Sequence, residues 1–166
     1  GQDSVSSWTL ANVVKLTGAA IVLERRLIEL STHKNFVVRW RSVHALGAAP
    51  SDAAIEALFL RLFIEGEKEG YVRYGAIRSL VEIALMSPPH RSQILDRFVE
   101  DLPRIKKDST VLNEFVNAAF ADQKSASADW PNALAPIFHR LIDLAESAEE
   151  IDRWSGILAD LYMLYQ

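Results

Sequence analysis

The sequence contains the stretch Val38-Arg39-Trp40-Arg41-Ser42-Val43-His44-Ala45-Leu46-Gly47, and a similar stretch returns 34 residues later as Val72-Arg73-Tyr74-Gly75-Ala76-Ile77-Arg78-Ser79-Leu80-Val81. Val, Arg, an aromatic residue, a β-branched residue and Leu recur in register within residues 35–84. A period of about 20 to 50 residues is typical of proteins in which similar units stack into an array. The repeat therefore predicts a solenoid.

The spacing of apolar residues predicts an all-α protein. No alternating run bounded by turns is present, so we expect no sheet. About nine helices are predicted, over residues 5–16, 20–30, 35–47, 51–65, 71–85, 87–102, 108–120, 130–145 and 147–164. We expect one leading helix followed by four antiparallel hairpins, which must stack because none can bury its apolar stripe alone.

Several residues are expected to begin or end these helices. The predicted N-caps are Asp3 or Ser4, Asn35, Ser51, Asp108 and the capping box Ser147-x-x-Glu150. Gly47 is expected to end its helix in a left-handed conformation. Pro103 is expected to end the sixth helix, and Pro136 to kink the eighth or move its start later.

Apolar side chains at helical spacing predict the buried faces. The inward residues expected at the two ends of the chain are Val5, Trp8, Val13, Leu16, Ile21, Leu23, Leu27, Ile28 and Leu30, then Ile151, Trp154, Ile157, Leu158, Leu161 and Leu164. Leu46 and Leu80 share one inward position of the repeat. Gly75 lies inside a predicted helix, where Gly costs about 1 kcal/mol against Ala, so we expect a neighbouring helix to approach it closely.

The repeat resembles the HEAT repeat family, including its short bacterial variants. That family begins its second helix with Val-Arg, followed by a small residue and then Leu at successive spacings of four. The matching residues are Val38, Arg39, Ser42 and Leu46, and again Val72, Arg73, Ala76 and Leu80. The family favours an Asp shortly before Val-Arg, where this chain has Asn35 and Glu69.

The resemblance implies a right-handed α-α superhelix, an armadillo-like architecture, over residues 1–166 as a single domain. Its clearest repeats are 20–47 and 51–86. In the family the Val-Arg helices line the concave face. Arg39 and Arg73 recur at one repeat position, so we expect them to bond loop carbonyls or acidic residues of neighbouring repeats.

The candidate binding residues follow from the same register. If Val38, Ser42 and Leu46 point inward, the opposite side carries Trp40 and His44, then Tyr74 and Arg78. Aligning Val111 with Val72 adds a third pair, Asn113 and Asn117. Exposed aromatic residues beside Arg and Asn are typical of binding surfaces. The alternative is that Trp40 and Tyr74 cover the next repeat.

Composition and motifs exclude several kinds of chemistry. The chain has 166 residues and no cysteine, which excludes disulfides and cysteine-ligated zinc, and we expect a cytoplasmic location. No uncharged apolar run is long enough to cross a membrane, and no signal peptide is expected. His33, His44, His90 and His139 form no metal-binding pair, and no phosphate-binding glycine loop or nucleophile elbow occurs. We expect no metal, no cofactor and no catalytic residue.

The sequence leaves two main hypotheses for the function. In a third, the repeats support a separate catalytic domain. We expect a non-catalytic scaffold that binds a protein, a peptide or a neighbouring domain on its concave face. The alternative is a nucleic-acid-binding protein, since some DNA glycosylases have a HEAT-like fold with a carboxylate and aromatics in a basic groove. Glu82 would be the candidate acid. The net charge is −4, made of +1 in residues 1–82 and −5 in residues 83–166, which disfavours nucleic acid.

Overall fold

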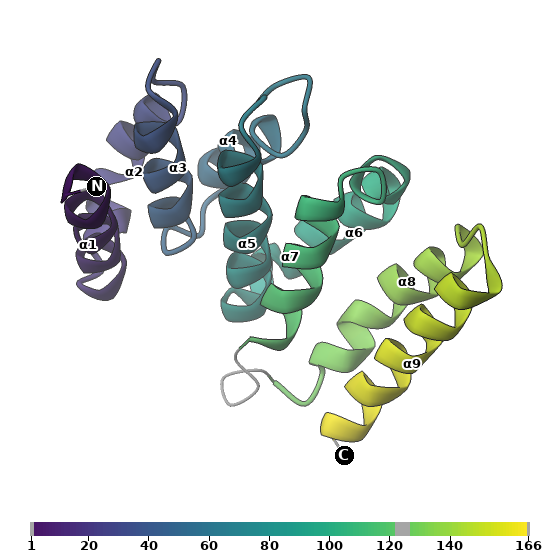
Figure 1. The fold of residues 1–166 in the computed structure, drawn as a ribbon. Helices are drawn as coiled ribbons and strands as arrows, with labels where there is room; N and C mark the ends of the chain where they lie inside the picture. Colours follow the sequence, from purple (N-terminus) through teal and green to yellow (C-terminus); the bar gives the residue numbers. More distant parts are fainter. Residues whose placement is uncertain (1, 122–126, 166) are drawn as a thin grey trace.

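The computed structural model describes residues 2–121 and 127–165, with side chains from Ser7 onward. These residues form nine α-helices and no strand (Figure 1). The helices are α1 (Gln2–Leu16), α2 (Ala19–Leu30), α3 (Phe36–Leu46), α4 (Asp52–Leu60), α5 (Gly70–Met86), α6 (Pro88–Ile105), α7 (Ser109–Phe120), α8 (Trp130–Asp143) and α9 (Ala148–Leu164). The prediction of an all-α protein is confirmed. No described helix has the length and hydropathy that a membrane span requires.

The helices pack in two rows. Helices α1, α3, α5 and α7 contact one another in succession, and we call them the odd-helix row. Behind them α2 packs on α3 and α4, while α6 contacts α5 and α8 (Figure 1). At the far end α9 packs against α8. The helices between the two ends thus bury their apolar sides against preceding and following helices of the chain.

The core is continuous from α2 to α9. Leu46 and Leu80 are both fully buried, as the repeat predicts. A series of phenylalanine rings then crosses from α4 to α8, with centroids 5.7 Å apart for Phe59–Phe98, 5.7 Å for Phe98–Phe115 and 6.1 Å for Phe115–Phe138. Such tilted and edge-to-face pairs add to the stabilisation from burial alone.

The ends of the chain are less buried than predicted. In α1 and α2 Leu27 is buried, but Leu16 is 87% exposed, Ile21 is 63% exposed, and Trp8, Val13 and Leu23 are also exposed. In α9 Trp154, Leu158 and Leu161 are buried, whereas Ile151 and Leu164 are exposed. The predicted inward stripes are confirmed only in part there, because a helix at the end of the described helices has a neighbour on one side only. The predicted residue Val5 and the caps Asp3 and Ser4 lie outside the described side chains.

Four predicted caps are confirmed. The side chains of Asn35, Ser51 and Asp108 each accept a hydrogen bond from a backbone N–H in the first turn of α3, α4 and α7. Ser147 does the same for α9 by accepting from the N–H of Glu150. The Glu150 carboxylate accepts from the N–H of Glu146. These bonds satisfy donors that a helix start leaves open.

Other predicted helix ends are wrong. Gly47 follows α3 in a right-handed conformation with φ −58°, and Gly18 has the positive φ of 71° among the described glycines. Helix α6 continues past Pro103 to Ile105, and α8 begins at Trp130, so Pro136 does not move its start later. Pro103 lies in the last turn of α6, where its missing N–H removes one helical bond and the helix ends two residues later. Helix α4 ends at Leu60, before the predicted residue 65, and turns and a bend follow over residues 61–66.

Candidate functional site

A groove of about 440 Å³ lies on the odd-helix row between α1, α3 and α5. The four residues that the repeat places together, Trp40, His44, Tyr74 and Arg78, all line it. The remaining lining residues are Trp8, Asn12, Lys15 and Leu16 of α1 and Glu82 of α5. The contribution of α1 was not predicted, because this helix lies outside the repeat and was assigned no place in the row.

Aromatic rings form one end of this groove. The centroid of the Trp40 ring lies 6.5 Å from that of Trp8 and 5.0 Å from that of Tyr71. The guanidinium carbon of Arg41 lies 3.8 Å from the Trp40 centroid and 4.7 Å from the Trp8 centroid. A cation over aromatic faces is attracted to both, so Arg41 holds the two indoles in place.

Gly75 allows α5 to approach Trp40. A Cβ built on Gly75 would lie 3.0 Å from Val43 Cγ2 and 3.1 Å from Trp40 Cδ1. Real Cβ atoms rarely have such close neighbours, so a side chain here would displace the indole or Val43. The expected close approach at Gly75 is confirmed, and it places Trp40 between its own helix and α5.

His44 is part of the groove floor, and its side chain is buried. The residue is 6% exposed, and the Trp8 ring covers it at a centroid distance of 4.6 Å. Its Nε2 atom lies 3.4 Å from Asn12 Oδ1. Burial, and then the charges of Lys15, Arg78 and Arg41, lower the pKa of the imidazole to about 3. The prediction of an exposed His44 is wrong because α1 covers it, and at neutral pH its ring is uncharged.

Four charged side chains form a chain of ion pairs across the odd-helix row. Lys15 Nζ of α1 lies 2.5 Å from Glu82 Oε2, and Arg78 Nε lies 3.2 Å from Glu82 Oε1. Arg78 Nη1 also donates to Glu114 Oε1 of α7 at 2.9 Å. We call these residues the ion chain. Burial alone would lower the pKa of Arg78, but the charges of Glu82 and Glu114 and a hydrogen bond with Tyr74 raise it above its ordinary value.

A second groove of about 430 Å³ continues on the other side of the ion chain. It shares Lys15, Leu16, Arg78 and Glu82 with the first groove. Its other lining residues are small or aliphatic, namely Gly47, Ala48, Leu85, Met86, Ala118 and Ala121. The two grooves together extend from α1 to α7, with aromatic residues at one end and small residues at the other.

Asn113 and Asn117 do not line either groove. Both are exposed on α7, and Asn113 Oδ1 accepts a hydrogen bond of 3.4 Å from Arg153 of α9. Helix α7 instead presents Glu114 to the ion chain and Ala118 to the second groove. The predicted alignment itself agrees with the helix starts, because the N-caps Asn35, Glu69 and Asp108 each lie three residues before the aligned valine. The prediction that Asn113 and Asn117 line the groove is nevertheless wrong, since both side chains stay exposed outside it.

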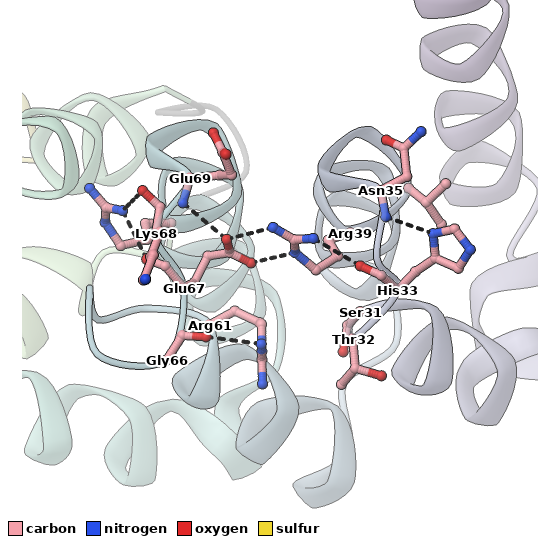
Figure 2. A network of polar contacts seen from close by, with 12 residues as sticks. Ser31, Thr32, His33, Asn35, Arg39, Arg61, Gly66, Glu67, Lys68 and Glu69 are labelled. Atoms are coloured by element: carbon pink, nitrogen blue, oxygen red, sulfur yellow. Dashed lines mark hydrogen bonds and ion pairs between the residues drawn. The ribbon is translucent and has the colours of Figure 1, made fainter.

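The repeated arginines join successive repeats away from the groove (Figure 2). Arg39 donates from Nε and Nη2 to the two oxygens of Glu67, at 2.6 and 2.8 Å, and from Nη1 to the carbonyl oxygens of His33 and Lys34. Arg73 repeats the pattern with Asp108 at 2.8 Å and with the carbonyls of Glu67 and Lys68. The expected loop and acidic partners are confirmed. Asp108 stands three residues before Val111, as Asn35 and Glu69 stand before their valines, whereas Glu67 lies two residues before Glu69.

Electrostatics of the Arg39–Glu67 pair fit a structural role. Burial would raise the pKa of the Glu67 carboxyl, but hydrogen bonds from Arg39 and from the N–H of Glu69, with the Arg39 charge, lower it below its ordinary value. The same pair raises the pKa of Arg39, chiefly through the hydrogen bond. The Glu67 side chain is only 2% exposed, so these bonds compensate the cost of burying its charge.

The described residues hold no cluster of three His, Cys, Asp or Glu side chains that could bind a metal ion. Comparison with protein-family models, curated proteins and solved structures gives no match for this chain. The candidate site therefore rests on its own geometry, which consists of an aromatic groove, an aliphatic groove and the ion chain between them.

Proposed function

We propose that this chain is a HEAT-like repeat scaffold, a right-handed α-α superhelix, that binds an extended segment of another protein on the odd-helix row. The row would form the concave face. The segment lies across both grooves, with an aromatic or apolar side chain against Trp8, Trp40 and Tyr74. No catalytic step is proposed.

The ion chain is the observation that carries this proposal. Lys15 and Arg78 are each paired with a carboxylate, and Glu82 and Glu114 are each paired with a cation. Because these charges compensate one another, the groove requires no strongly charged ligand. Aromatic rings offer a large contact area with few rotatable bonds to immobilise, which suits a neutral peptide.

The extent of the two grooves favours a chain segment over a small molecule. They meet at four shared residues and together run past all four helices of the odd-helix row. An extended peptide can contact both grooves and receive hydrogen bonds from polar groups such as Asn12 and Lys15. A polyanion such as nucleic acid requires several unpaired cations, and the two in this groove are already paired.

Selection from a random peptide library tests the proposal. Peptides enriched on the wild-type protein are then titrated against Trp8→Ala and Tyr74→Ala, with Leu60→Ala as the matched control because Leu60 is exposed on α4, away from both grooves. We expect each groove substitution to weaken binding about tenfold or more and the control to leave it unchanged.

Two results would contradict the proposal. One is a library that yields no binder, or binders whose affinity is the same for all variants. The other is retention of the wild-type protein on heparin with a steep salt dependence that Lys15→Ala and Arg78→Ala abolish, which would indicate a nucleic-acid groove.

A further inference from the structure

One end of the molecule has an apolar surface on α1 and α2. Leu10, Val13, Ile21 and Val22 are all exposed there. Isolated apolar side chains are common on protein surfaces, but several on two helices that contact each other are typical of an interaction site. We call this surface the α1–α2 face.

An apolar groove of about 330 Å³ opens onto the α1–α2 face. It lies where α1, α2 and α3 meet, and its floor includes Val38 and Ala45 of α3. Leu10 and Leu23 line this groove and are themselves exposed, so groove and surface are continuous. Arg26 also lines the groove, and the neighbouring Arg25 side chain is 97% exposed.

The opposite end of the molecule presents a helix with unused apolar surface. Helix α9 packs against α8, at the far end from α1 (Figure 1). Its exposed residues Ile151, Ser155, Ala159 and Tyr162 follow at helical spacing and therefore form one stripe. Met163 and Leu164 are exposed beyond it.

Charge distinguishes the two ends. Arg25 and Arg26 of α2 are exposed and share one partner, Glu29. Asp152 and Asp160 of α9 are exposed and each follows a residue of the apolar stripe, and with Glu149 they outnumber the exposed Arg153 of the same helix. One end is therefore an apolar groove beside arginines, and the other is an apolar helix beside aspartates. Complementary charges of this kind favour association and fix its orientation.

We propose that a second copy of this chain docks its α9 onto the α1–α2 face of the first. Apolar side chains of the α9 stripe occupy the groove beside Leu10 and Leu23, and Asp152 and Asp160 lie near Arg25 and Arg26. The two surfaces are different, so the contact is head-to-tail and leaves one free face at each end of the assembly. Further copies add in the same way and continue the stacking of helical units.

Sedimentation velocity over a concentration series tests this proposal. The wild-type weight-average mass is expected to rise with concentration beyond that of two chains. Leu10→Glu blocks the α1–α2 face and Ile151→Glu blocks α9, so each variant alone is expected to sediment as one chain. Leu60→Glu, at an exposed site on α4, is the control and should assemble like the wild type.

Mixing the two blocked variants provides the decisive result. Each retains one intact face, so an equimolar mixture is expected to form a species of two chains and nothing larger. The proposal is overturned if the wild type sediments as one chain throughout, if the mixture stays monomeric, or if Ile151→Glu assembles like the wild type. Circular dichroism of each variant verifies its fold.

Charge reversal gives an independent readout that needs no apolar substitution. Arg25→Glu is expected to weaken assembly, and mixing it with Asp160→Arg is expected to restore pairing. Added salt should weaken the wild-type assembly, since exposed charges are screened. Assembly that is insensitive to Arg25→Glu, to Asp160→Arg and to salt would contradict the charged part of the contact.

Discussion

The carboxylate of Glu82 lies directly over Gly47. A Cβ built on Gly47 would come 2.6 Å from Glu82 Oε2 and 2.9 Å from Ser79 Oγ. Gly47 follows the last residue of α3, and Glu82 crosses this point from α5 to reach Lys15 of α1. The requirement for glycine here is therefore one of space, and the backbone conformation of Gly47 would suit any residue.

Gly47→Ala is expected to lower the free energy of unfolding by roughly 1–3 kcal/mol, the usual cost of overpacking. The Glu82 carboxylate can rotate away, but Ser79 is buried and donates to the Val43 carbonyl, so it cannot. Urea unfolding measures the loss. Gly156→Ala is the matched control: nothing lies within 4 Å of its Cβ, so it should stabilise α9 by up to about 1 kcal/mol. Equal effects at the two glycines would contradict the crowding at Gly47.

Leu46→Ala and Leu80→Ala are each expected to cost about 2–5 kcal/mol, because both side chains are fully buried and leave cavities. Leu60→Ala, on the exposed side of α4, should change stability by less than about 0.5 kcal/mol. Denaturant unfolding compares the three variants. Losses below about 1 kcal/mol at both buried positions would mean that the assigned repeat register is wrong.

Arg39→Met is expected to cost roughly 3–5 kcal/mol at pH 7, because it leaves the buried Glu67 carboxylate without its cation. The pH dependence has a definite sign. The pKa of Glu67 is lowered in the folded protein, so its stabilising effect is present above the ordinary carboxyl pKa and is lost as the pH falls. The difference in free energy of unfolding between the wild type and Arg39→Met should therefore become smaller as the pH falls.

The double variant with Arg39→Met and Glu67→Leu controls for this effect. It removes both charges together, so it should recover part of the stability lost in Arg39→Met. The free energy of unfolding of the wild type, the single variant and the double variant is measured from neutral to acidic pH. If the free energy lost in Arg39→Met were the same at all pH values, this would contradict the role assigned to Glu67.

The His44 imidazole is expected to remain neutral at pH 5, because its pKa is lowered from 6.5 to about 3. The unfolded chain takes up a proton near the ordinary value and the folded chain does not, so His44 destabilises the fold progressively as the pH falls below 6.5. Nitrogen chemical shifts of the ring report its protonation state. His44→Gln should reduce the loss of stability between neutral pH and pH 5, and an imidazole charged at pH 5 would contradict the burial by Trp8.

The repeat predicted a large part of this structure because its signals are local. The spacing of apolar residues locates the helices, and the N-cap residues Asn35, Ser51 and Asp108 mark where three of these helices begin. Arg39 and Arg73 recur at one position, which indicated their bonds to loop carbonyls and acids. Each of these inferences depends on contacts within a repeat or between adjacent repeats.

The unpredicted parts depend on longer-range packing. Helix α1 covers His44 because it lies beside α3 in the odd-helix row. The sequence of α1 contains no copy of the repeat, so its place in the row could not be predicted. Leu16 and Ile21 are exposed because α1 and α2 lie at one end of the described helices, while their spacing is that of buried residues. In α7 the aligned residues Asn113 and Asn117 stay exposed and Glu114 reaches the ion chain instead, which the repeat register did not predict.

The ion chain gives the odd-helix row a mechanical property. It links Lys15 of α1 to Glu114 of α7 through two side chains of α5, so these helices are joined across about a hundred residues of backbone. Tension applied between α1 and α7 is expected to act on these side chains as well as on the packed helices between them. High ionic strength screens partly exposed ion pairs, so it is expected to make the groove face easier to stretch.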